Sequence, residues 1–196
     1  MIGRNSRARR TGGLALLFLL LSAGPPAGAA DVKYRRTIEW YDVPAVTLVN
    51  QDGEKVDLRP LLVESDKPVL LDFVYSSCTT ISPILSAGFS GFQEKLGGNS
   101  DGVRLVSISI DPDNDAPGVM KEYLRGYGAK PGWQFLTGSL EDIKAVILAF
   151  GAYDLKKKIH YPLTFLRAPE ADHWVRIYGF PGTSDLMAEY RKLAGE

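Results

Sequence analysis

A continuous apolar segment that ends close to a cysteine constrains the fold of this chain more than any other feature. Within the segment KPVLLDFVY, the run between Pro68 and the Ser76-Ser77 pair is apolar apart from one aspartate. Such a run is typical of a strand buried on both faces of a parallel sheet. Cys78 follows, and a helix is predicted over Ile81–Leu96, where leucine and phenylalanine recur at helical spacing until Gly97 and Gly98 end it.

Strands and helices alternate along the rest of the chain. Ser139 and Asp142 have the spacing of a capping box, which predicts a helix from there to about Phe150. Such alternation argues for one α/β domain, which we place at residues 43–196. With a cysteine between a strand and a helix, it predicts a thioredoxin-like fold with a central mixed sheet, an N-terminal hairpin and flanking helices. The other predicted elements are a hairpin in AVTLVNQDGEKVDL, strands at Val103–Ile110, WQFLT, PLTFLRA and WVRIYGF, and helices at Val119–Tyr127 and from a cap at Thr183 or Ser184 to Leu193.

Residues 1–30 have the pattern of a secretory signal peptide. Four arginines precede an apolar run, Leu14–Ala23, which is followed by Pro-Pro and small residues. We predict cleavage after Ala29 or Ala30 and a polar surface arm at residues 31–42. An uncleaved membrane anchor is the alternative, although a span needs roughly 20 apolar residues. Export would place the protein in the periplasm, in contact with the membrane only through this segment or through a membrane-bound partner.

The charge of the chain argues against a nucleic-acid partner. The 23 basic residues balance the 23 acidic ones, but four of the basic residues precede the predicted cleavage site. The exported domain therefore has a formal charge near −4. Phosphate binding requires clustered cations, and the sequence contains no basic stripe with interleaved aromatic residues.

Cys78 is the only cysteine, so it cannot form a disulfide within the chain. In an oxidising compartment it is a buried inert thiol, a reactive thiol, a metal ligand or a crosslink to another chain. The start of the predicted helix near Ile81 should lower the pKa of its thiol. Ser82 stands where a second cysteine would complete a CxxxC pair. Phe73 and Tyr75, which precede the cysteine, are interpreted as core or rim aromatics.

Three segments resemble the motifs of the Sco copper-chaperone family, also called SenC or PrrC, in the order and spacing of that family. FVYSSCTTISPILS resembles its aromatic-rich strand, CxxxCP motif and helix. VRLVSISIDPDNDAP resembles its strand with an Asp-Pro turn and a later Asp-x-Pro. IHYPLTFLRAPEADHW resembles the segment with a histidine just before a main strand. The match covers about Val43–Leu193.

The resemblance implies a periplasmic or membrane-attached domain that binds copper through two cysteines and one histidine. Cys78 matches the first cysteine, His160 the histidine and Asp111 the acidic residue of the Asp-Pro turn, while Ser82 occupies the second cysteine position. The implied copper ligands are Cys78 and His160, with Ser82 and Asp111 as weaker contributors. The implied partner is a cytochrome oxidase subunit or another periplasmic cuproprotein, assembled by a copper chaperone rather than by an enzyme.

Ser82 lowers the copper affinity expected of this site. Cu(I) favours thiolates, and a neutral hydroxyl is a poor substitute. Thiol–disulfide exchange also needs a resolving thiol, which the chain lacks. Two alternatives remain open: a metal-free relative that binds a partner, and a single-cysteine thiol peroxidase. The peroxidase is disfavoured because Leu71 and Tyr75 occupy the positions of the proline and threonine in the peroxidatic signature.

Two further predictions concern the surroundings of His160. Thioredoxin-like folds often have a cis-proline before the strand opposite the active cysteine, so the Tyr161–Pro162 bond is predicted to be cis and close to Cys78. Lys156–Lys158 form a short basic run beside the histidine. This run is either a solvated surface segment or a docking site for an acidic partner.

Overall fold

A mixed eight-stranded sheet forms the centre of the protein, in the order β1-β10-β9-β4-β5-β6-β2-β3. The computed structural model describes residues 34–97, 102–154 and 159–195. Strands β4, β5 and β6 run parallel, and the remaining neighbours in the sheet pair antiparallel. The elements in chain order are β1 (Tyr34–Glu39), β2 (Thr47–Asn50), β3 (Lys55–Asp57), α1 (Leu58–Leu62), β4 (Val69–Val74), α2 (Ile81–Leu96), β5 (Arg104–Ser109), α3 (Pro117–Gly126), β6 (Trp133–Thr137), α4 (Leu140–Ala149), β7 (Tyr153–Asp154), β8 (Ile159–His160), β9 (Leu163–Arg167), β10 (Trp174–Gly179) and α5 (Thr183–Ala194).

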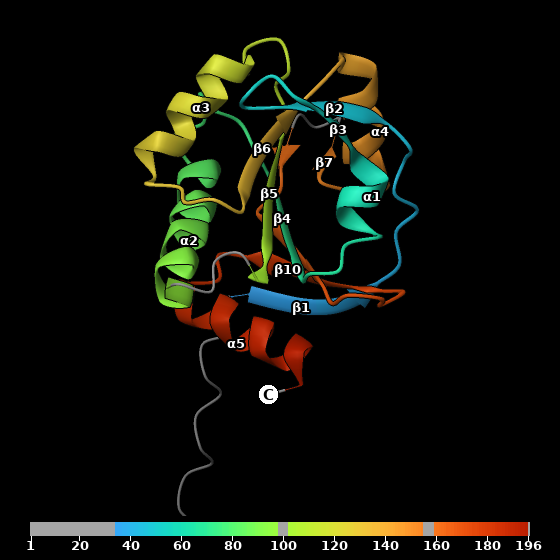
Figure 1. The fold of residues 1–196 in the computed structure, drawn as a ribbon, viewed down its shortest axis with the longest axis vertical. Helices are drawn as coiled ribbons and strands as arrows, with labels where there is room; N and C mark the ends of the chain where they lie inside the picture. Colours follow the sequence, from blue (N-terminus) through green and yellow to red (C-terminus); the bar gives the residue numbers. More distant parts are fainter. Residues whose placement is uncertain (1–33, 98–101, 155–158, 196) are drawn as a thin grey trace, which may run out of the picture. The chain divides into compact units, whose positions relative to one another are not determined.

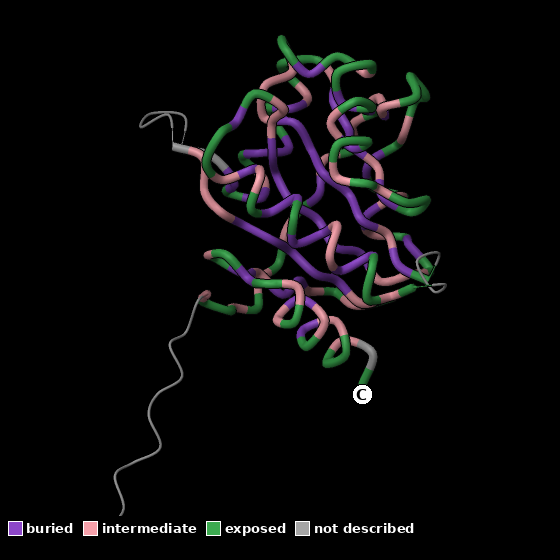
Figure 2. The backbone as a smooth tube through the Cα atoms, turned by 90° about the vertical axis from the view of Figure 1, so that its left-hand side faces the viewer, coloured by how far each residue is buried: buried purple, intermediate pink, exposed green. Residues whose placement is uncertain are grey.

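Helices cover both faces of this sheet, with α2 and α3 on one side and α1 and α4 on the other (Figure 1). Every residue of β4 is buried, and Figure 2 shows buried backbone running through the middle of the domain. Leu71 and Phe73 join the hydrophobic core on the α1 and α4 side, whereas Leu70 and Val74 join the core beneath α2, α3 and α5. The predicted mixed sheet, its hairpin β2–β3 and its flanking helices are confirmed.

The helix that follows the cysteine has the predicted bounds, Ile81–Leu96. Gly97 ends it with φ of 59°, a conformation that glycine adopts without steric cost. The α4 cap is also as predicted, because the Ser139 hydroxyl accepts a hydrogen bond of 3.1 Å from the backbone N–H of Asp142. Local sequence signals were sufficient at both of these helix ends.

The two ends of the described chain differ from the predictions. Residues 34–39, expected in a surface arm, form β1 at the sheet edge, where Tyr34 and Arg36 donate to the buried Glu189 of α5 at 3.1 and 2.8 Å. Neither Thr183 nor Ser184 caps α5. Gly182 is the N-cap, and its N–H donates to the Asp185 carboxylate at 2.9 Å. Pairing with the distant strand β10 makes residues 34–39 a strand. The carboxylate of Asp185, inside the first turn, sets where α5 begins.

No peptide bond is cis in the described ranges, so the predicted cis bond at Tyr161–Pro162 is wrong. The trans isomer is the ordinary preference of an X–Pro bond. Hydrogen bonds hold both sides of this bond: Tyr161 N–H donates to the Ala152 carbonyl at 3.4 Å, and the Pro162 carbonyl accepts from Gly179 at 2.9 Å. The predicted signal segment, residues 1–30, and Lys156–Lys158 lie outside the described residues. Within the described part of the chain, no helix is long and apolar enough to cross a membrane.

Candidate metal centre

Cys78 lies in the loop between β4 and α2, with only 7% of its surface exposed. Its backbone N–H donates to the carbonyl of Tyr75 at 3.2 Å, which closes a turn after the strand. The Sγ atom accepts a hydrogen bond of 3.4 Å from the N–H of Ser82 and lies 3.8 Å from the Thr80 hydroxyl. The sulfur therefore faces the first turn of α2, as the sequence predicted.

The surroundings of Cys78 favour its thiolate form. Burial raises the pKa of the thiol, but hydrogen bonds from the Ser82 hydroxyl, from the backbone of Ser82 and Thr80 and from Tyr75 outweigh it and lower the pKa to about 6. The two backbone donors belong to the start of α2, where the N–H groups lack partners within the helix. The expected lowering of the pKa is confirmed, and side-chain hydroxyls contribute to it together with the helix terminus.

Ser82 connects the end of β4 to the sulfur. Its side chain is fully buried, its Oγ accepts from the Tyr75 N–H at 3.1 Å, and its hydroxyl hydrogen-bonds the Cys78 thiolate. Thr80 rather than Ser82 is the N-cap residue of α2. The hydroxyl at the second cysteine position is thus a hydrogen-bond donor to the thiolate.

His160 is held at the end of β8, which pairs with β7. Its Nε2 lies 2.7 Å from the carbonyl oxygen of Phe73. A carbonyl can only accept, so Nε2 carries the proton and Nδ1 carries the lone pair. Nδ1 is buried and has no hydrogen-bond partner among the described residues. Burial lowers the pKa of this histidine, and the opposing effect of the hydrogen bond to Phe73 is smaller. The lowered pKa favours the neutral imidazole, whose Nδ1 lone pair is available to a metal.

Tyr75 is a common neighbour of the two predicted ligands. Its side chain hydrogen-bonds the Cys78 sulfur, and its ring centroid lies 5.8 Å from that of His160 at an interplanar angle of 60°. Sequence reasoning treated it as a core or rim aromatic and missed this role; a tyrosine at the strand end, three residues before the cysteine, was the available signal. No group of three or more Cys, His, Asp or Glu residues suited to holding a metal occurs in the described ranges.

The acidic residue that contacts the cysteine loop is Asp115, not Asp111. Both carboxylate oxygens of Asp111 accept from the Asn114 amide, at 3.0 and 2.9 Å, so this side chain closes its own turn. Asp115 is fully buried and accepts hydrogen bonds from the backbone N–H and the hydroxyl of Ser76. The Asp-x-Pro motif marked this residue in the sequence, but without assigning it a contact.

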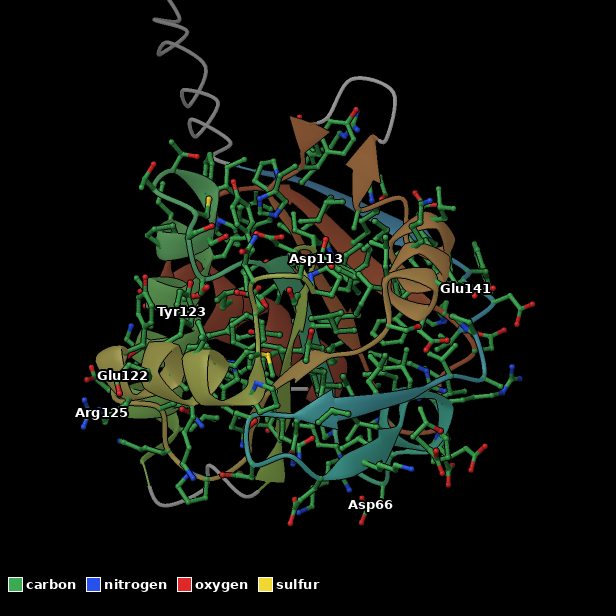
Figure 3. All side chains as sticks on the ribbon, turned by 90° about the horizontal axis from the view of Figure 1, so that it is seen from above. Asp66, Asp113, Glu122, Tyr123, Arg125 and Glu141 are labelled. Atoms are coloured by element: carbon green, nitrogen blue, oxygen red, sulfur yellow. The ribbon has the colours of Figure 1, made fainter. Side chains whose placement is uncertain are left out.

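A groove of about 890 Å³ opens beside Cys78. One wall is the loop Ser76–Cys78 and the other is α3. Figure 3 views the protein from above and labels Glu122 and Tyr123 on α3, together with Asp113 on the loop before it. Cys78 is one of the residues that line the groove. Its remaining lining residues on or just after α3 are Gly118, Val119, Gly126 and Tyr127.

Comparison with known proteins identifies the family. The SCO1/SenC family model matches residues 43–178. The chain belongs to the SCO1/SenC family. The SCO1 protein homolog of Bacillus subtilis (strain 168) is 34% identical over 142 residues, which cover 67% of this chain and 69% of that protein.

Solved Sco structures share the fold. BsSco, described as a member of the Sco family of cytochrome c oxidase assembly proteins, is 30% identical with a TM-score of 0.65, over 80% of this chain and 95% of that structure. ScoI of Bradyrhizobium japonicum with copper bound is 27% identical with a TM-score of 0.62, over 74% of this chain and 94% of that structure. These likenesses confirm both the family resemblance and the thioredoxin-like fold predicted from the sequence.

Proposed function

We propose that this SCO1/SenC protein is a periplasmic copper-binding assembly protein, with Cys78 and His160 as its copper ligands. Its client would be a respiratory copper oxidase or a related cuproprotein, and it would act by binding rather than by catalysis. Two observations carry the proposal: Cys78 has a stabilised thiolate, and His160 has a buried Nδ1 without a hydrogen-bond partner among the described residues, and each of the two residues has Tyr75 as a neighbour. The assembly role and the bound copper described for Sco relatives support it.

The protonation states of the two side chains suit a soft metal. The pKa of Cys78 is lowered to about 6, so copper need not displace a thiol proton at neutral pH. His160 is favoured as the neutral imidazole, and its Nε2–H bond to the Phe73 carbonyl leaves Nδ1 to donate to a metal. Thiolate and imidazole are donors that copper accepts in proteins.

Ser82 limits how tightly copper would be held. Its hydroxyl donates to the same sulfur that would bind the metal, so copper and Ser82 compete for electron density on Cys78. A neutral hydroxyl is also a weaker ligand for Cu(I) than a thiolate. The Asp111 carboxylate accepts from the Asn114 amide, so it would have to give up these hydrogen bonds to contribute to copper binding. A weaker site would favour copper transfer to a client with a complete ligand set.

The test is anaerobic copper titration of the exported domain, residues 31–196, followed by absorption spectroscopy. Cys78→Ala and His160→Ala should each abolish stoichiometric binding and the thiolate-to-copper charge-transfer band. His173→Ala is the matched control, because His173 is partly exposed and bonded to Asp172 rather than to the site. Ser82→Cys should increase Cu(I) affinity by completing a two-thiolate site.

A metal-free, partner-binding protein is the second candidate function. It is favoured by the absence of a three-residue ligand group in the described residues and by the engagement of Ser82 with the sulfur. If wild type binds no copper and only Ser82→Cys does, this candidate replaces the first. Copper binding by wild type that survives Cys78→Ala would also contradict the proposed ligands.

A further inference from the structure

The loop that carries Cys78 is fastened from two sides. On the α2 side, the Ser82 hydroxyl accepts from the Tyr75 N–H at 3.1 Å. On the opposite side, Asp115 accepts from the backbone N–H of Ser76 at 3.1 Å and from the Ser76 hydroxyl. These bonds hold the two consecutive residues that lead from β4 into the cysteine turn. The first attachment contacts the sulfur directly, whereas the second reaches it only through the loop.

Asp115 is itself fixed in place. Its side chain is fully buried, and its second carboxylate oxygen accepts from the Ser109 hydroxyl at 2.5 Å. The Ser109 oxygen in turn accepts from the Asp111 N–H at 3.0 Å, and the Asp115 N–H donates to the Asp111 carbonyl at 3.0 Å. A buried carboxylate is costly unless its oxygens are hydrogen-bonded, and these bonds meet that requirement.

This carboxylate joins the two walls of the groove. Ser76 and Cys78 line the same wall of the groove, and Asp115 lies two residues before Pro117, where α3 starts. Ser76 is held through both its backbone N–H and its hydroxyl, so the link is a two-point attachment. Without it, the loop would keep its attachment to Ser82 but lose the one to the α3 side.

We propose that Asp115 is a positioning residue for Cys78, which fixes the cysteine loop against the start of α3 and thereby sets how far the sulfur opens into the groove. The effect on the position of the sulfur is independent of any metal. The consequence for copper rests on the proposed function, because a displaced sulfur would no longer meet His160 in a common coordination shell.

The test uses the alkylation rate of Cys78 by iodoacetamide, measured on the exported domain without metal. A pH of about 8.5 keeps the thiolate of every variant largely ionised, so that rate differences report access rather than titration. Removal of a charged hydrogen-bonding anchor should raise the rate for Asp115→Ala on the order of tenfold. Asp115→Asn keeps an acceptor for Ser76 and should restore most of the wild-type rate.

Two further variants make the experiment decisive. Ser76→Ala removes only the hydroxyl bond and should give a smaller increase, without disturbing the buried Ser109 contact. Asp113→Asn changes an exposed carboxylate on the same loop and should leave the rate unchanged. Alkylation rates of Asp115→Ala and Ser76→Ala within twofold of wild type would overturn the proposal, as would an equal increase in Asp113→Asn. If Asp115→Ala fails to fold, Ser76→Ala decides the outcome alone.

A copper titration of the same variants separates this proposal from the proposed function. If wild type binds copper, Ser76→Ala should shift the thiolate-to-copper band or weaken binding while urea unfolding remains close to wild type, a readout that a purely structural contact would not move. An unshifted band and unchanged affinity would count against positioning. If wild type binds no copper, the proposed function fails, and the alkylation rates still decide the role of Asp115.

Discussion

Asp72 is a carboxyl group in the middle of the hydrophobic sheet, and its ionisation should control stability near neutral pH. It is fully buried on β4, between Leu70 and Val74 in sequence. Burial raises its pKa to about 7, and the nearby Ser107 hydroxyl, which lowers the pKa, offsets only part of this effect. Ser107 also accepts a hydrogen bond from the Trp133 indole at 3.0 Å. The folded protein therefore favours the neutral carboxyl group at this position.

The direction of the pH effect follows from the raised pKa. Well below the ordinary pKa of 3.8, Asp72 is neutral in both the folded and the unfolded chain, so its ionisation has no effect on stability. Between about pH 4 and pH 7 the unfolded chain ionises while the folded chain resists, so the free energy of unfolding falls. A pKa raised from 3.8 to about 7 corresponds to a loss on the order of 4 kcal/mol above pH 7, at ~1.4 kcal/mol per pH unit. Local rearrangement around the ionised group would reduce this figure.

Replacing Asp72 with asparagine removes the ionisation and keeps the side-chain size. The free energy of unfolding of Asp72→Asn, measured by urea titration, should be close to wild type at about pH 4 and exceed it by several kcal/mol at about pH 8. Asp113→Asn is the control, since this exposed carboxylate should give the same difference from wild type at both pH values. A difference between Asp72→Asn and wild type that stays flat across this range would refute the reasoning, because Asp72 would then be ionised without penalty.

Two other substitutions test the site and the packing of α2. Ser82→Ala removes a hydrogen-bond donor to the sulfur and should raise the pKa of Cys78 by about one to two units. The pKa is measured from the pH dependence of thiolate ultraviolet absorption. Ser86→Ala is the control, because this buried serine is hydrogen-bonded to Tyr123 and its removal should leave the pKa of Cys78 unchanged. Gly91→Ala would bring a methyl group within 2.3 Å of the Thr183 hydroxyl on α5 and should lower the free energy of unfolding by about 1–3 kcal/mol. Gly118→Ala meets nothing within 4 Å and should be neutral or stabilising; equal losses in both glycine variants would contradict the packing argument.

The sequence predicted those parts of the fold that depend on local patterns. The buried strand β4, the bounds of α2 and the serine cap of α4 all follow from apolar spacing, glycine and capping residues. The strand β1 could not be predicted from local patterns of this kind. Its polar sequence YRRTIE joins the sheet because β10 offers an antiparallel partner and Glu189 accepts from its side chains. Contacts with residues so far along the chain leave no periodic pattern in the sequence of the strand itself.

The sequence named candidate residues for the site, but it gave no information on their contacts. Cys78 and His160 were marked by their positions, but the donor nitrogen of His160 follows only from the contact with the Phe73 carbonyl. Asp111 and Asp115 lie in one motif with equal chemical character, and the sequence did not indicate which of them contacts the cysteine loop. Burial decides between them: Asp115 reaches Ser76 beneath the surface, while Asp111 binds Asn114 at the rim.

Ser82 changes the chemistry that the candidate site can perform. In a two-cysteine site the second sulfur would share the metal or close a disulfide, and neither reaction is open to a hydroxyl. The hydroxyl instead stabilises the remaining thiolate, together with Tyr75 and the first N–H groups of α2. A serine at position 82 therefore leaves the candidate site with one thiol, whose pKa is lowered to about 6. A site of this kind suits reversible binding of a soft metal better than disulfide chemistry, and for that reason Ser82→Cys is expected to gain affinity and redox activity together.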